Sequence, residues 1–181
     1  MKRVLVVIDM QNDFIDGALG TKQAEEIVDH VTTKIKEYKG ETVFATRDTH
    51  GEDYLNTSEG RHLPVVHCVK GTEGWQLNGK VEEALRLVNA KIIDKPTFGS
   101  EILADKLCEL NRQEKEQGKE GIEIELVGLC TDICVVSNAL LIKAKLYETP
   151  IKVDAKCCAG VTPDSHEAAL LTMKMCQVEV E

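Results

Sequence analysis

The chain has 181 residues, of which 43% are hydrophobic and 29% are charged, and its formal net charge is −9 at pH 7. This composition is typical of a soluble globular protein, and we interpret residues 1–181 as a single domain. The acidic balance, with no Lys or Arg cluster free of neighbouring acids, argues against nucleic acid and anionic membrane as partners. No segment approaches transmembrane length.

The N-terminal segment and the cysteines together predict a cytoplasmic protein. The start "MKRVLVVIDMQNDF" is basic, but its apolar run is too short for a signal peptide and lacks a small-residue cleavage site. The seven cysteines are odd in number and irregularly spaced, which favours free thiols in a reducing compartment. The oligomeric state is not predicted and a homo-oligomer is possible, because an acidic surface neither requires nor forbids self-association.

Short apolar runs alternate with helical patterns along the chain. The run "RVLVVID" is continuously apolar, which is typical of a strand covered on both faces. In chain order, the patterns predict a strand at 3–9, a helix at 24–38, a strand at 41–46, a loop at 47–75, a helix at 80–88, a strand at 90–94, a helix at 100–117 that frays into a surface loop, a strand at 122–128, a helix at 132–146, a strand at 151–154, a helix at 163–175 and an edge strand at 176–181.

This regular alternation predicts an α/β protein. We expect a single-domain, three-layer α/β/α fold with a mainly parallel central sheet, because strand–helix–strand units place helices on both faces. In open sheets of this kind, ligands bind beyond the carboxyl ends of the strands. The side chains predicted at that edge combine acids, an imidazole, a lysine and two thiols: Asp9, Asp48, His50, Lys95, Cys130 and Cys134.

Thiol chemistry is the first function that this edge indicates. A cysteine attacks only as its thiolate, and both an ammonium and a helix N-terminus favour that form. Cys134 lies in the first turn of the predicted helix at 132–146, and Lys95 supplies a cation. Asp9 is placed to accept the thiol proton and return it to a leaving group, while backbone amides near Cys130 are placed to hold an oxyanion.

Structural alternatives stay open for each of these residues on its own. Cys134 could be a buried apolar thiol, as most free cysteines are. A redox or metal pair of Cys130 and Cys134 is disfavoured, because redox pairs usually have two intervening residues and no further thiolates complete a metal set. The presence of Asp9 and Lys95 on the same edge favours the catalytic interpretation.

The predicted loop carries a second set of candidate ligands. Asp48 and His50 lie two residues apart, and "EGRHLPVVHC" adds Glu59, His62 and His67. Carboxylate and imidazole groups together suit Zn²⁺, Fe²⁺ or Mn²⁺. The alternative is that the histidines are structural, with satisfied hydrogen bonds in the core.

The segments "VVIDMQNDF", "KPTFGS" and "VGLCTDICV" resemble the three catalytic segments of the isochorismatase-like cysteine hydrolases, and most of all their nicotinamidase/pyrazinamidase branch. The resemblance continues through "DAKCCAGVTPDSHEAAL" and covers essentially the whole chain. It implies a Rossmann-like topology and a catalytic triad of Asp9, Lys95 and Cys134. It also implies a cis peptide bond between Leu129 and Cys130, with the backbone N–H groups of Cys130 and Cys134 forming an oxyanion hole.

The same resemblance implies a divalent metal, with zinc expected and iron or manganese as alternatives, and no organic cofactor. Asp48, His50 and His67 match the ligand pattern of the branch, in which the metal binds a pyridine nitrogen. The fourth ligand is expected to be Glu59, although it stands one residue further from His67 than the pattern has it, and His62 is the competitor.

The activity that the resemblance implies is hydrolysis of a small carboxamide through a cysteine thioester. Nicotinamide, cleaved to nicotinate for NAD salvage, is the expected substrate, with pyrazinamide as a side substrate and Phe14 stacking on the ring. The alternative on the same fold is a hydrolase of an N-carbamoyl or ureido amide. A phosphoacceptor receiver domain and a catalytically silent binding module are the non-enzymatic alternatives.

Overall fold

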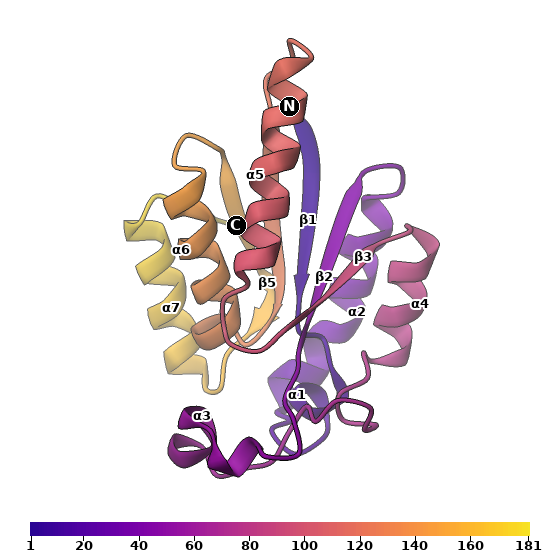
Figure 1. Cartoon of the computed structure of the whole chain (residues 1–181), viewed down its shortest axis with the longest axis vertical. Helices are drawn as coiled ribbons and strands as arrows, with labels where there is room; N and C mark the ends of the chain where they lie inside the picture. The colour runs from indigo at the N-terminus through magenta and orange to yellow at the C-terminus, as the bar shows by residue number, and fades with distance from the viewer.

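The computed structural model describes residues 1–181 and contains one sheet of six parallel strands in the order β3-β2-β1-β4-β5-β6. Helices cover both faces of this sheet, which confirms the predicted α/β fold (Figure 1). The strands are β1 (Lys2–Ile8), β2 (Thr42–Asp48), β3 (Lys91–Lys95), β4 (Ile122–Leu129), β5 (Ile151–Ala159) and β6 (Glu179–Val180). The helices are α1 (Asn12–Ile15), α2 (Lys22–Glu37), the 3₁₀ turn η1 (Tyr54–Asn56), α3 (Ser58–His62), α4 (Gly79–Leu87), α5 (Glu101–Glu116), the π-helical turn η2 (Thr131–Val135), α6 (Val136–Lys145) and α7 (Pro163–Met175).

Strand β1 occupies the middle of the sheet because its side chains are apolar on both faces. Residues 4–8 are fully buried. Successive side chains of a strand point to opposite faces, so β1 contributes to two separate cores. Leu5 and Val7 pack in the core with α2 and α4, whereas Val4 and Val6 pack in the core with α5, α6 and α7.

Three short helices are present in the structure that the sequence analysis did not predict. Helix α1 follows β1, and η1 and α3 lie inside the predicted loop at 47–75. Helices of three to five residues contain too few positions to display a helical repeat, so periodicity does not reveal them. Local capping still holds α3 in place, because the Thr57 side chain accepts a hydrogen bond from the N–H of Gly60 (3.0 Å).

Three predicted elements have bounds that differ by more than two residues or change character in the structure. The strand predicted at 151–154 continues to Ala159, although Asp154 and Lys156 interrupt the apolar pattern. The helix predicted at 132–146 begins as the π-helical turn η2 and becomes regular only at α6. The edge position of the strand predicted at 176–181 is confirmed, since β6 pairs with β5 alone, but the strand covers only Glu179–Val180.

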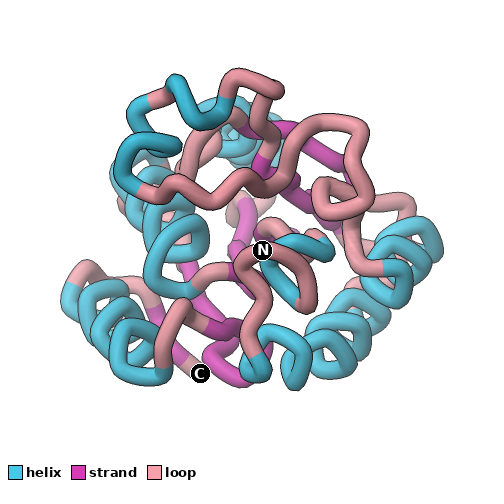
Figure 2. The backbone as a smooth tube through the Cα atoms, turned by 90° about the horizontal axis from the view of Figure 1, so that it is seen from below, coloured by secondary structure: helices cyan, strands magenta, loops and turns pink.

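The carboxyl ends of β1 to β4 all lie at one edge of the sheet, which is the lower end in Figure 1. The segments that carry α1 and α3 lie at this end, and Figure 2 shows loops gathered there around the strand ends. None of the helices has both the length and the apolar composition that crossing a membrane would demand. The strand order therefore brings the candidate side chains at or directly after the ends of β1 to β4 together at this one edge of the sheet.

Gly128 controls how closely β4 approaches β1 at this edge. It pairs with Ile8 in the register of the two strands, and its φ of +120° lies in the region that favours glycine. A Cβ at this position would lie 2.1 Å from the backbone oxygen of Ile8. The absent side chain therefore allows the end of β4 to lie directly against the end of β1.

We expect Gly128→Ala to lower the free energy of unfolding by roughly 2–4 kcal/mol, because the new methyl group collides with backbone and the φ angle is unfavourable for alanine. The unfolding midpoint should fall by roughly 5–15 °C in a chain of this length. Thermal and urea unfolding measure the effect. Gly79→Ala is the matched control, since its Cβ would meet no atom within 4 Å. Equal midpoints for the two variants would contradict the assignment.

Candidate active site and metal centre

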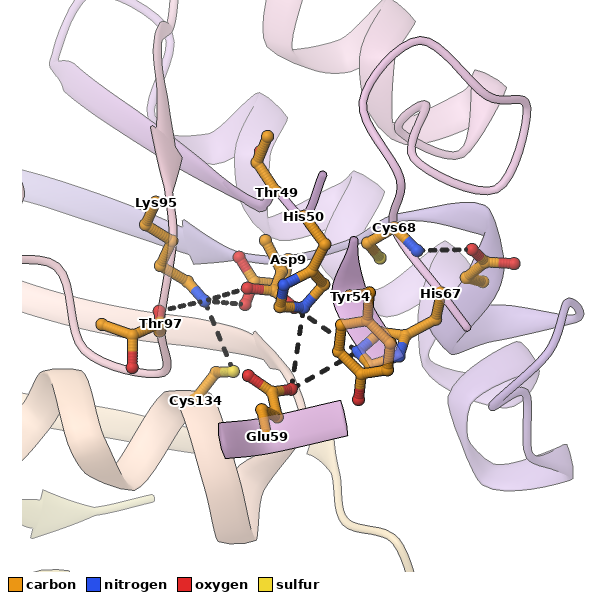
Figure 3. Close-up of polar contacts among 12 residues, drawn as sticks. Asp9, Thr49, His50, Tyr54, Glu59, His67, Cys68, Lys95, Thr97 and Cys134 are labelled. Carbon is orange, nitrogen blue, oxygen red and sulfur yellow. Dashed lines mark hydrogen bonds and ion pairs between the residues drawn. The ribbon is translucent and has the colours of Figure 1, made fainter. Parts of the chain in front are cut away.

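The structure brings Asp9, Lys95 and Cys134 into one buried group. Asp9 directly follows β1, Lys95 is the last residue of β3, and Cys134 lies in η2 after β4. The Lys95 ammonium is 2.7 Å from Oδ2 of Asp9 and 3.5 Å from Sγ of Cys134 (Figure 3). At most 4% of each residue is exposed. A carboxylate, an ammonium and a thiol thus share one site that water hardly reaches.

The backbone conformation of Asp9 and a hydrogen bond to its side chain together hold the carboxylate in place. Its backbone has a φ of +46°, an uncommon conformation that aspartate tolerates better than most residues. The Thr46 hydroxyl donates a 2.7 Å hydrogen bond to Oδ1, which leaves Oδ2 facing Lys95. Sequence reasoning missed Thr46. Its signal is a polar residue inside the buried strand β2, on the same face as Asp48.

Lys95 remains charged in spite of its burial. Burial favours the neutral amine, but Asp9, the Cys134 sulfur and Asp48 outweigh this effect and raise the pKa of Lys95 above its ordinary value. The ammonium also donates a 3.0 Å hydrogen bond to the backbone oxygen of Thr97, and it lies 3.5 Å from Oδ1 of Asp48. Lys95 therefore acts as a fixed positive charge between the thiol and two carboxylates.

The surroundings of Cys134 favour the protonated form of its thiol. Burial raises its pKa and the Asp9 carboxylate raises it further, while Lys95 lowers it. The expectation that Lys95 favours the thiolate is right in sign but covers only part of the balance. The pKa of Asp9 is also raised, through burial first, although Lys95 opposes the shift. Moving the proton from Cys134 to Asp9 leaves the net charge of the group unchanged, so the transfer requires no charge to enter or leave the buried site.

The turn that carries Cys134 has the backbone form that the resemblance implies. The peptide bond between Leu129 and Cys130 is cis. The Cys130 carbonyl accepts hydrogen bonds from the N–H groups of Ile133 (3.1 Å) and Val135 (3.0 Å), and the Cys130 N–H donates none within the chain. The Cys130 N–H is therefore available to a ligand in the adjacent cavity.

Asn138 fixes this turn from the side of α6, and sequence reasoning missed it. The side chain is fully buried and donates hydrogen bonds to the backbone oxygens of Cys134 (2.8 Å) and Phe98 (3.0 Å). It also accepts one from the N–H of Ser100 (2.9 Å). The turn that carries Cys134 and the "KPTFGS" segment are thereby joined by one amide. A fully buried Asn inside a helical pattern is the signal that could have revealed it.

Four of the candidate metal ligands form a second group beside the first. The ligand atoms of Asp48, His50, Glu59 and His67 all lie within 4.8 Å of one another. Nε2 of His50 is 2.8 Å from Asp48, and Nε2 of each histidine is 3.6 Å from Oε1 of Glu59. His62 is not part of this group, since it is exposed and its Nδ1 bonds to the backbone oxygen of Ser58 at 2.8 Å.

The donor set fits a divalent metal. Two imidazole nitrogens and two carboxylate oxygens suit Zn²⁺, Fe²⁺ or Mn²⁺. Nδ1 of His67 lies 2.8 Å from the backbone oxygen of Val65, which can only accept, so Nδ1 carries the proton and Nε2 keeps a free lone pair. Asp48 belongs to both groups, because Oδ2 faces the histidines while Oδ1 faces Lys95.

Two further residues support this second group and were not identified from the sequence. The ring of Tyr54 packs 4.7 Å from that of His50 and 4.9 Å from that of His67, measured between centroids. The Gln11 side chain holds the backbone of Asp48, accepting from its N–H (2.7 Å) and donating to its oxygen (2.8 Å). Both side chains are fully buried. In the sequence, the only signal for either residue is that Gln11 is a polar residue directly after the first predicted strand.

Both groups open onto one cavity of about 620 Å³. Cys134 and Cys130 line it, as do Asp48, Glu59 and His67. Phe14 also lines it, with its ring 5.5 Å from that of His67. The remaining wall is mainly apolar and consists of Leu19, Thr21, Ala24, Ser58, His62, Leu63, Thr97, Phe98, Leu129, Ile133, Gly160 and Val161. Such a cavity suits a flat apolar molecule with one reactive polar group.

Comparisons with known proteins agree with one another. The family model for the isochorismatase domain matches residues 3–181. The nicotinamidase of Schizosaccharomyces pombe is 28% identical to the chain, covering 97% of this chain and 91% of the yeast protein. The crystal structure of nicotinamidase/pyrazinamidase PncA from Bacillus subtilis is similar with 29% identity, a TM-score of 0.79 and 99% of both chains covered. The pyrazinamidase of Pyrococcus horikoshii, solved in complex with zinc, is similar with 26% identity, a TM-score of 0.74 and coverage of 100% of this chain and 99% of that one.

We expect Glu59→Ala to weaken Zn²⁺ binding by at least about 10–100-fold, which is the loss seen when even an outer partner of a metal ligand is removed. The physical reason is that the ion loses one of four donors. Competition against a chromophoric chelator measures the affinity. His62→Ala is the matched control and should bind Zn²⁺ as the unaltered protein does. Weaker binding in the control, or unaltered binding in Glu59→Ala, would reverse the choice between the two residues.

Proposed function

The chain belongs to the isochorismatase family, and we propose that it hydrolyses nicotinamide to nicotinate and ammonia with Cys134 as the nucleophile. The observation that carries the proposal is that a buried Asp9–Lys95–Cys134 group and a two-histidine, two-carboxylate group open onto the same cavity. The activity makes the protein an amidohydrolase of NAD salvage. Pyrazinamide, which differs from nicotinamide by one ring nitrogen, is expected to be a second substrate.

The first step forms a thioester on Cys134. Asp9 takes the proton from the thiol while Lys95 compensates the charge that develops on sulfur. The thiolate attacks the carbonyl carbon of the amide, and the carbonyl oxygen becomes an oxyanion. The backbone N–H groups of Cys130 and Cys134 would stabilise that oxygen. Asp9 then gives its proton to the amide nitrogen, the C–N bond breaks and ammonia leaves.

The second step hydrolyses the thioester. Asp9, now ionised again, removes a proton from a water molecule that attacks the thioester carbonyl. The same N–H groups stabilise the second oxyanion. When it collapses, the C–S bond breaks, the sulfur regains the proton from Asp9, and nicotinate is released. The proton that leaves Cys134 at the start thus departs with ammonia by way of Asp9, and a proton from water replaces it on the sulfur by the same route.

Asp48, His50, Glu59 and His67 would hold the divalent metal, and zinc is the ion we propose. A bound metal would supply a Lewis-acid contact to the pyridine nitrogen and so orient the ring. Phe14 lines the cavity beside His67, where its ring would stack on that of the substrate. A cytoplasmic location is part of the proposal, and the seven free thiols support it, because free cysteines persist in a reducing compartment.

The four-donor group favours nicotinamide over an N-carbamoyl or ureido amide. A substrate without a ring nitrogen would leave this buried group without a role in binding. A receiver domain would have no use for Cys134. The 3.5 Å distance between its sulfur and the Lys95 ammonium therefore disfavours that alternative. The binding-module alternative is disfavoured because all three members of the catalytic group are present and in contact.

Cys134→Ala should reduce ammonia release from nicotinamide by a factor on the order of 10⁴ or more, as removal of a covalent nucleophile does in other hydrolases. Coupled detection of ammonia measures the rate. Cys176→Ala is the matched control, because Cys176 is an exposed free thiol outside the cavity. Retained turnover in Cys134→Ala would remove this residue as the nucleophile.

Removal of the metal with a chelator should lower kcat/KM for nicotinamide by about 10²-fold or more, because a ring that is no longer oriented presents its carbonyl out of reach of the sulfur. Adding Zn²⁺, Fe²⁺ or Mn²⁺ back separately identifies the ion that restores turnover. An N-carbamoyl amide serves as the comparison substrate. Turnover of that compound but not of nicotinamide by the metal-loaded protein would favour the alternative substrate class.

A further inference from the structure

The turn that carries Cys134 is also held by a segment that the proposed chemistry does not use, residues 160–166 between β5 and α7. Two successive residues of η2 bond to it. Oγ1 of Thr131 lies 2.8 Å from Nδ1 of His166, and the Asp132 carboxylate accepts hydrogen bonds from the N–H of Val161 at 3.0 and 3.2 Å. Thr131 is fully buried.

The position of His166 is itself fixed by the start of α7. Thr162 caps this helix by accepting a hydrogen bond from the N–H of Ser165 (3.1 Å), and the Ser165 hydroxyl accepts one from the N–H of Thr162 (3.1 Å). His166 follows at the end of the first turn, and its N–H donates to the Thr162 oxygen (3.0 Å). The ring therefore projects from a rigid element toward the turn.

Gly160 shows that the close approach of this segment is built into the chain. A Cβ at Gly160 would lie 2.9 Å from Cβ of His166 and 3.0 Å from its Cα and N. Real Cβ atoms essentially never approach this closely, so any other residue would push the start of α7 away. Gly160 and Val161 also line the catalytic cavity, so the same segment contacts both the turn and the cavity.

We propose that His166 is a positioning residue, which acts through its hydrogen bond to Thr131 to hold the nucleophile turn and the adjacent oxyanion donors in their reactive geometry. The proposal rests on the proposed function of Cys134. It assigns no proton transfer to His166, since Thr131 separates its ring from the reacting atoms. The direction of the hydrogen bond is immaterial, because hydroxyl and imidazole can each donate or accept.

The shape of the histidine ring provides a specific test. Nδ1 of histidine is two bonds from Cβ, as are the amide oxygen and nitrogen of asparagine. The amide atoms of glutamine are three bonds from Cβ. His166→Asn should therefore keep the bond to Thr131, and His166→Gln and His166→Ala should lose it. The last two should lower kcat about 10–100-fold, the cost of a small misplacement of the reacting groups. KM should change little, because the proposed metal and ring contacts come from other segments.

A double-mutant cycle tests whether His166 acts through Thr131. Thr131→Val removes the hydroxyl with little change in shape, and its effect on kcat should match that of His166→Ala. The double variant should be no slower than either single variant, because both remove the same bond. Additive losses, or equal damage in His166→Asn and His166→Ala, would overturn the proposal.

A second readout does not depend on amide hydrolysis. The alkylation rate of Cys134 by iodoacetamide, located by mass spectrometry of the Cys134 peptide, should change in His166→Ala and return to the original value in His166→Asn. His30→Ala is the matched control, since His30 lines the same outer cavity as His166 but bonds to the backbone oxygen of Lys156. Unaltered alkylation in His166→Ala, with an unfolding midpoint equal to that of the control, would also overturn the proposal. If the unaltered protein releases no ammonia, the proposed function fails while the alkylation test still decides the role of His166.

Discussion

The charge of Lys95 in the interior is the constraint on which the rest of the site depends. An ammonium that is 1% exposed requires opposite charges at close range, because the cost of removing it from water is otherwise several kcal/mol. Asp9 at 2.7 Å and Asp48 at 3.5 Å supply them, each from the end of a different strand. The strand order β3-β2-β1-β4 is what makes this possible, since it sets the ends that carry Lys95, Asp48, Asp9 and the Cys134 turn side by side. Removing either carboxylate would leave the buried ammonium with only one opposite charge, which destabilises the fold because a buried charge requires compensation.

Asp48 joins this charge to the candidate metal group. Its two oxygens face different partners: Oδ1 lies toward Lys95 and Oδ2 lies toward His50 and His67. One carboxylate therefore sets the distance between the thiol and the four-donor group. Gln11 and Tyr54 keep that distance from changing, the first by bonding to the Asp48 backbone and the second by packing against both imidazoles. The spacing between Cys134 and the candidate metal group is thus determined by buried contacts, which suits a substrate whose carbonyl and ring nitrogen are separated by rigid bonds.

The sequence was sufficient for the fold and for the residues with distinctive chemistry. The apolar run at 3–9 and the alternation of strands and helices predicted the parallel sheet, and the rule that ligands bind at the carboxyl ends of strands predicted where Asp9, Lys95 and Cys134 would meet. The choice between Glu59 and His62 was not decidable from spacing, because the short helix α3 that turns Glu59 inward is invisible to periodicity. The roles of Thr46, Asn138 and His166 were not predicted from the sequence, for a related reason. Each is an ordinary residue type whose role comes from one contact across the fold, and no local pattern marks such a contact.

The turn that carries Cys134 shows why those ordinary residues matter. A π-helical turn lacks the regular hydrogen-bond ladder of an α-helix, so its form depends on what surrounds it. Here three elements hold it: β4 leads into it next to Gly128, Asn138 of α6 bonds to the Cys134 oxygen, and the segment before α7 bonds to Thr131 and Asp132. Burial and Asp9 raise the pKa of the thiol, so the proposed proton transfer requires the sulfur to stay where Asp9 and Lys95 can act on it. A nucleophile activated by geometry rather than by a permanently low pKa requires a rigid turn, and the surrounding elements provide that rigidity.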